Sequence, residues 1–202
     1  MEKKNVKAKF IYRLMAFLID VMIVYFITTL ISYPFIASKT ENIEKISNQA
    51  SEVVEQFAAG EITMNNYIGE TAVLSFESAK IQGITILITI FVSIIYFVII
   101  QYNNKGQTFG KKLMKIKINS LNGNLTMNQL IVRSLLINSI LLNMIQVIAI
   151  SFINDSMVYF YVDLLFESVQ YLFIFISIIL IMFSKERKGL HDLIAKTEVI
   201  YS

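Results

Sequence analysis

Long apolar runs separated by polar segments make up most of the 202 residues. A helix needs about 20 apolar residues to cross a hydrocarbon core of about 30 Å. The pattern therefore predicts an all-α polytopic membrane protein with four transmembrane helices, at residues 14–37, 81–101, 130–152 and 164–183. Polar residues interrupt the third run most, namely Arg133, Asn138, Asn143 and Gln146.

The segments outside these runs alternate in charge. Residues 2–13, 105–133 and 185–198 carry more basic than acidic residues, whereas residues 39–80 hold seven Glu and residues 155–167 hold three acids and no base. Basic segments favour the cytoplasmic side of a membrane, so both termini are predicted to be cytoplasmic. The basic residues behind the net charge of +3 are concentrated in the predicted cytoplasmic segments, so no nucleic acid is expected as a partner.

The acidic segment at residues 38–80 is predicted to be a helical extracytoplasmic insert. Apolar residues recur at three- and four-residue steps from Ile43 to Phe57, with Glu mostly between them, which is typical of an amphipathic helix. Gly60 provides a stop for this helix, and Thr63 is the expected N-cap of a second short helix. The insert is either a solvated cover over the bundle or a lid that binds a partner or gates a substrate.

The basic inner loop begins with the motif Gly106-Gln107-Thr108-Phe109-Gly110-Lys111. A phosphate-binding Walker loop needs a wider glycine spacing and a Ser or Thr directly after its lysine, so nucleotide binding is not expected. The motif is more typical of a tight turn whose lysines, including Lys111, contact anionic lipid headgroups.

A small β element is predicted on the cytoplasmic face. Residues 114–119 alternate between apolar and polar, which is the period of a strand. Asn122-Gly123 is a turn signal, after which Leu125-Thr126 is expected to return as a second short strand. Thr126 is also the expected cap of the third span. Residues 197–201 have an extended pattern too, and we expect them to pair with residues 116–119.

Ionised side chains inside the predicted spans are the main candidates for function. Asp20 lies in an otherwise uncharged apolar run, where a carboxylate costs about 2.5–3.5 kcal/mol. Arg13 lies seven residues earlier, on nearly the same helix face. We expect Asp20 to pair with Arg133, which lies about one turn inside the third span. Arg13 is then left to pair with Asp192 of the tail.

Two interpretations of these charges remain open. In the first, they form buried ion pairs that fix the register of the helices and hold the tail. Removing one partner of such a pair typically costs about 3–5 kcal/mol. In the second, Asp20 takes up a proton or binds a small cation, and the balance between desolvation and a neighbouring arginine decides whether it titrates. Oxygen ligands for a cation are offered by Asn138, Asn143 and Gln146.

Missing residue types argue against several chemistries. Without Cys there is no thiol nucleophile, disulfide or Cys-ligated metal. His191 is the sole histidine; it is a candidate proton relay, but we expect backbone groups to satisfy it instead. One His among scattered acids does not make a metal site, and no G-x-S-x-G nucleophile motif occurs. We therefore expect no enzyme activity, no cofactor and no bound metal centre.

Together these motifs resemble the RDD family of small bacterial membrane proteins. The matching pieces are Arg13–Asp20, Gly106–Lys111, Arg133 and Arg187–Asp192 with Thr197. The family is named after one Arg and two Asp, and the resemblance implies that these are Arg13, Asp20 and Asp192. It also implies a multi-pass protein of the bacterial cytoplasmic membrane, with transport as the usual proposal and cation/proton exchange suggested for some members. Phe109 stands where such families usually have Pro, which leaves the turn less rigid.

Two functions follow as expectations. The first is a small transporter or cation/proton exchanger built on Arg13, Asp20 and Asp192. Four spans leave little room for a pathway, so it would work as a homo-oligomer or beside a membrane partner protein. The second is a non-transporting accessory or scaffold protein in the lipid bilayer, which docks a partner through residues 38–80 or through the basic inner loop.

Overall fold

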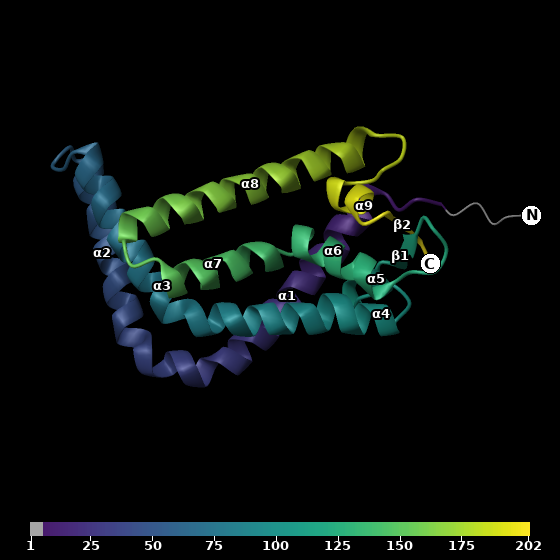
Figure 1. Cartoon of the computed structure of the whole chain (residues 1–202), viewed down its shortest axis with the longest axis horizontal. Coiled ribbons are helices and arrows are strands. Elements are labelled where there is room, and N and C mark those ends of the chain that lie inside the picture. Colours follow the sequence, from purple (N-terminus) through teal and green to yellow (C-terminus); the bar gives the residue numbers. More distant parts are fainter. Residues whose placement is uncertain (1–5) are drawn as a thin grey trace, which may run out of the picture. The chain divides into compact units, whose positions relative to one another are not determined.

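The computed structural model describes residues 6–202, which are mostly helical (Figure 1). The helices in chain order are α1 (Phe10–Ile36), the short 3-10 helix η1 (Ala37–Lys39), α2 (Thr40–Ala58), α3 (Met64–Ile94), the π-helical segment η2 (Ile95–Ile100), α4 (Gln101–Asn103), α5 (Phe109–Leu113), α6 (Met127–Ile137), α7 (Ile140–Phe152), α8 (Ser156–Phe183) and α9 (Leu190–Ile194). The two strands are β1 (Ile116–Ser120) and β2 (Thr197–Tyr201).

Three continuous helical segments are long and apolar enough to cross a membrane, namely Phe10–Ala58, Met64–Asn103 and Ser156–Phe183. Helices α6 and α7 make a fourth candidate if they count as one span, but they are bent by 66° at a break. The prediction of one uninterrupted helix at residues 130–152 is therefore wrong. The break lies at Asn138 and Ser139, where Ser139 has a φ of +54° that an α-helix cannot accommodate.

The helices of the predicted insert are confirmed, with one change. Helix α2 ends at Ala58, and Gly60 follows with a φ of +76°, as expected for a C-terminal glycine. The Thr63 hydroxyl accepts a hydrogen bond from the Asn66 N–H at 3.3 Å, which confirms Thr63 as a cap. Residues 64–79, however, do not form a separate short helix, because α3 continues without a break into the second span.

The chain divides into two compact units. The first comprises residues 6–28, 89–141 and 169–202, and it contains every candidate site residue named above except two amides of the third run. The second comprises residues 29–88 and 142–168 and packs around Phe76, Ala149 and Tyr159, with the Phe76 and Tyr159 rings 5.1 Å apart. Each unit is thus held by its own buried residues.

The predicted pairing of the inner loop with the tail is confirmed. Strands β1 and β2 are antiparallel, with a register that runs from Ile116 opposite Tyr201 to Ser120 opposite Thr197 (Figure 1). The alternation buries Ile116, Ile118 and Val199 in one cluster of the first unit, together with residues of α1 and α6.

Two features of this sheet differ from expectation. Leu125-Thr126 does not return as a strand, because β1 takes the tail as its partner; the turn at Asn122-Gly123 makes only a single bridge, between Ser120 and Gly123. On its other edge β2 pairs with the segment before α1, where the Ala8 N–H donates to the Val199 carbonyl at 3.0 Å. Strand β2 therefore lies between the inner loop and the N-terminal segment.

Candidate functional site

Asp20 of α1 lies at the centre of a hydrogen-bonded cluster, and its side chain is fully buried. Its Oδ1 accepts hydrogen bonds from the Tyr96 hydroxyl at 2.7 Å and from the Gly110 N–H at 2.8 Å. Its Oδ2 accepts one from the Thr108 hydroxyl at 2.5 Å and lies 3.5 Å from Lys111 Nζ. We call Asp20, Tyr96, Thr108, Gly110 and Lys111 the Asp20 cluster.

The inner-loop motif folds so that its polar groups reach this carboxylate. Thr108 is the N-cap of α5, with its hydroxyl accepting from the Lys111 N–H. The same hydroxyl donates a hydrogen bond to the Asp20 carboxylate. The first N–H groups of α5 have no partner within the helix, so Gly110 is free to donate to the carboxylate. The motif thus provides a preformed set of donors for one buried acid.

Both glycines of the motif are required by close approach. A Cβ on Gly110 would lie 2.8 Å from Asp20 Oδ1 and would also overlap the Ala16 carbonyl. Gly106 has a φ of +88°, and a Cβ there would overlap the backbone of Ile118. The Gly106 carbonyl accepts a hydrogen bond from the Ile118 N–H at 3.0 Å, which ties the loop to β1.

The expected pairing of Asp20 with Arg133 is wrong. Arg133 makes its ion pair with Asp192, and the basic partner of Asp20 is Lys111. Depth along a helix can be read from residue spacing, but the direction in which neighbouring helices lie cannot. The sequence also gave no indication that the inner loop folds back onto α1.

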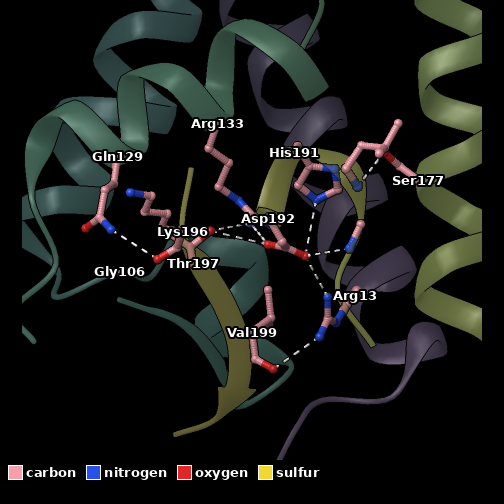
Figure 2. A network of polar contacts seen from close by, with 12 residues as sticks. Arg13, Gly106, Gln129, Arg133, Ser177, His191, Asp192, Lys196, Thr197 and Val199 are labelled. Atoms are coloured by element: carbon pink, nitrogen blue, oxygen red, sulfur yellow. Dashed lines mark hydrogen bonds and ion pairs between the residues drawn. The ribbon is translucent and has the colours of Figure 1, made fainter. Parts of the chain in front are cut away.

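Asp192 of α9 is the centre of a second buried cluster (Figure 2). Its Oδ2 accepts from Arg13 Nη1 at 3.1 Å, which confirms the expected pair, and its Oδ1 forms an ion pair with Arg133. The Gly189 N–H donates to the carboxylate at 3.1 Å and the Thr197 hydroxyl does so at 3.4 Å. We call Arg13, Arg133, Gly189, Asp192 and Thr197 the Asp192 cluster.

This second cluster fastens the tail to the rest of the first unit. Arg13 also donates from Nε to the Ala8 carbonyl at 3.2 Å. Its Nη2 donates to the Val199 carbonyl, also at 3.2 Å (Figure 2). Asp192 closes the first turn of α9 through the Gly189 N–H, and the Leu190 N–H donates to the Ser177 hydroxyl of α8 at 3.1 Å. The tail is therefore joined to α1, α6 and α8.

His191 is buried beside the Asp192 cluster, with its Nε2 3.6 Å from Asp192 Oδ2. Within residues 6–202 its Nδ1 has no hydrogen-bond partner, so the expectation that backbone groups satisfy the ring is wrong. Burial, reinforced by the charges of Arg133, Arg13 and Lys111, holds the pKa of His191 well below its usual value of 6.5. The ring is therefore neutral at pH 7.

A cavity of about 190 Å³ lies between the two clusters within the first unit. Its polar lining includes Arg13, Lys111, Arg133 and His191, and most of the remaining wall is apolar, from α1, η2, α6 and α8. We call it the basic cavity. Three of its lining side chains are cationic, and they come from α1, α5 and α6.

The amides of the third run do not complete a cation site at Asp20. Asn138 lines the basic cavity, whereas Gln146 belongs to the second unit and donates to Asp163 at 2.9 Å. Across residues 6–202, none of the hydrogen bonds of Asp20 comes from Asn138, Asn143 or Gln146. In the same range no group of three or more His, Cys, Asp or Glu residues is placed to hold a metal ion.

The order and placement of these motifs agree with a comparison against known families. The family model described as RDD family matches residues 7–196. The chain belongs to the RDD family. No curated protein and no solved structure matches it. In this RDD protein the two acids carried over from the resemblance lie in separate clusters, Asp20 with the inner loop and Asp192 with Arg13.

Two participants were not singled out from the sequence. Tyr96 lies in an apolar run, and its hydroxyl was the only local signal that it had a polar partner. Gly189 was noticed only as part of the tail motif; its N–H binds Asp192, and a Cβ there would lie 2.7 Å from the His191 ring.

Proposed function

We propose that this RDD protein is a multi-pass transporter of the bacterial cytoplasmic membrane that exchanges a small cation for a proton at the Asp20 cluster. One observation carries the proposal. A fully buried carboxylate in a candidate span has two hydroxyl oxygens within 2.7 Å and a lysine as its basic partner. Ionisable groups at such depth are typical of ion pathways.

The Lys111 ammonium occupies the position that a cation would take. Its Nζ lies 3.5 Å from Asp20 Oδ2 and 3.2 Å from Thr108 Oγ1. The Asp20 carboxylate and the hydroxyls of Thr108 and Tyr96 offer the oxygen ligands that hard cations such as Na⁺ prefer. When Lys111 releases a proton, its amine becomes neutral and a bound Na⁺ restores the charge balance. One proton leaves for each cation that binds.

The charges around Lys111 favour such an exchange near neutral pH. Burial lowers the pKa of Lys111 to about 8, Arg133 acts in the same sense, and Asp20 acts in the opposite sense. The proposal therefore assigns the proton to Lys111, whereas proton uptake by Asp20 was one of the two interpretations left open from the sequence. Below pH 8 the ammonium competes with Na⁺ for Asp20, and above pH 8 this competition fades.

Flux in proteoliposomes tests the proposal. The purified chain is reconstituted with an internal pH-sensitive dye, and an external Na⁺ pulse is expected to drive protons out. Asp20→Asn and Lys111→Gln should abolish this exchange. Lys112→Gln, which removes the neighbouring exposed lysine of the same helix, should leave it unchanged. Undiminished flux from folded Asp20→Asn protein would refute the assignment.

The proposal includes the orientation indicated by the charge pattern, with both termini cytoplasmic and residues 38–80 outside. Because the chain contains no Cys, a single introduced thiol reports on its own side of the membrane. A membrane-impermeant thiol reagent applied to intact cells should label Ser47→Cys in α2 and not Asn122→Cys after β1. The reverse pattern would overturn the orientation.

A scaffold role is the second candidate, and α2 is the observation that favours it. This helix buries only Val53 among its described residues and leaves Val54 53% exposed. A scaffold predicts that the reconstituted chain carries out no exchange at any pH, so the flux experiment separates the two functions.

A further inference from the structure

The charges around the basic cavity do not balance. Arg13, Arg133 and Lys111 line it, and the carboxylates that face these groups are Asp20 and Asp192. His191 adds no further positive charge, because its ring is neutral at pH 7. Arg187 and Glu198 also act on Arg13, and their charges have opposite signs. One positive charge therefore remains without a buried counter-charge.

A buried charge without a counter-charge destabilises the folded protein, and a bound anion would supply the missing negative charge. Hydrogen-bond donors for such an anion are at hand. Within residues 6–202 the hydrogen bonds of Arg133 all come from Nη1, which leaves Nε and Nη2 without a protein partner. The Lys111 ammonium also lines the cavity and is a further donor.

Apart from Gln101, Ser134 and Asn138, the remainder of the lining is apolar, and it indicates the kind of anion. The apolar lining includes three residues of α1 and three of α8, namely Phe10, Leu14, Phe17, Ile174, Ile178 and Ile181. Phe17 is 38% exposed, so part of this wall reaches the surface of a helix that is a candidate span. A free inorganic anion gains nothing from such walls, whereas a hydrocarbon chain does.

We propose that the basic cavity binds the phosphate head of an anionic membrane lipid together with the first part of its hydrocarbon chain. The volume of about 190 Å³ suits this ligand, since an apolar cavity of about 150 Å³ holds benzene. Guanidinium groups match phosphate oxygens in planar, two-point hydrogen bonds. The proposal goes beyond cation exchange and does not depend on it.

Native mass spectrometry of the full chain in neutral detergent tests this inference. Delipidated protein is titrated with phosphatidylglycerol, with phosphatidylcholine of the same chains, and with inorganic phosphate. We expect one phosphatidylglycerol to bind at least about tenfold more tightly than phosphatidylcholine. Inorganic phosphate at the same concentrations should neither bind nor displace the lipid.

A matched pair of variants locates the site. Ile178→Trp fills the cavity and keeps every charged residue, whereas Ile179→Trp places the same side chain at a neighbouring position that is 39% exposed and outside the lining. The first should lower the affinity for phosphatidylglycerol at least about tenfold, and the second should not. If Ile178→Trp does not fold, Ile174→Trp makes the same test from one turn earlier.

Three results would overturn the inference. Equal affinities for the two lipids would show that the head charge is not recognised. Unchanged phosphatidylglycerol binding in the folded cavity-filled variant would place the lipid elsewhere on the protein. Equivalent binding or competition by inorganic phosphate would make the site one for free anions. None of these readouts uses ion flux, so they leave the proposed exchange untouched.

Discussion

Replacement of Asp192 by Asn tests the role of the Asp192 cluster directly. Asn has the same size and keeps one acceptor oxygen, but it leaves Arg13 and Arg133 buried without their carboxylate. The Asp192 side chain is completely inaccessible to solvent, so water does not replace the lost charge. Breaking a buried ion pair in this way costs about 3–5 kcal/mol. For a chain of this length that corresponds to a fall in the unfolding midpoint of about 10 °C.

The matched control is Glu186→Gln in the same tail. Glu186 also has two basic partners, Lys7 at 2.5 Å and Lys188 at 3.1 Å, but its side chain is 64% exposed. Exposed ion pairs contribute little because water screens them. The assay is thermal unfolding in detergent followed by size-exclusion chromatography, and Glu186→Gln should leave the midpoint unchanged.

A double variant shows whether charge is the cause. Asp192→Asn with Arg133→Met removes one of the two unpaired cations, so it should be more stable than Asp192→Asn alone. Two results would show that the cluster does not act through buried charge. In the first, the unfolding midpoint of the double variant falls by the full sum of the falls in the two single variants. In the second, the midpoint of Asp192→Asn equals that of Glu186→Gln.

Three further outcomes are expected. Gly110→Ala should lower the free energy of unfolding by about 1–3 kcal/mol in a denaturation assay, because the added methyl group overlaps Asp20. Gly69→Ala is the control and should not destabilise the protein, because Gly69 has open space around it in α3. Thr126→Ala removes the capping box of α6 and should cost about 1 kcal/mol by thermal unfolding, with Thr126→Ser as the variant that restores it. Because folding lowers the pKa of His191, the unfolded chain binds a proton more readily, so the free energy of unfolding should fall as the pH drops below 6.5. His191→Gln should remove this pH dependence of stability, and an equal pH dependence in both proteins would contradict the prediction.

Local features of the fold could be predicted because their signals are local. The apolar–polar alternation of residues 114–119 located β1, and the hydroxyls of Thr63 and Thr126 marked helix starts. Gly60 marked the end of α2. In each case a few neighbouring side chains determine the backbone conformation, so the sequence is sufficient.

The partners of the buried charges could be predicted only in part. Arg13 and Asp192 were paired correctly, whereas Asp20 was assigned to Arg133 because both lie at similar depth. The true partner, Lys111, lies beside Asp20 because it belongs to α5 and because Gly110 allows this helix to approach α1 closely. Such a contact depends on the packing of several elements, and no spacing in the sequence records it.

The break in the third span falls between these cases. Asn138 was recognised as a polar interruption, but an amide inside an apolar run is compatible with either packing between helices or a chain break. The left-handed conformation of Ser139 decides for a break, and nothing in its side chain required it.

The most direct test of the proposed exchange is the pH dependence of ²²Na⁺ binding to the purified protein between pH 6 and pH 10. Competition with the Lys111 ammonium predicts an apparent affinity that rises about tenfold per pH unit below pH 8 and levels off above it. Lys111→Gln should bind Na⁺ with no such dependence, while Lys112→Gln should follow the original protein. Sodium binding that is absent at all pH values, or that rises identically in Lys111→Gln, would contradict the account.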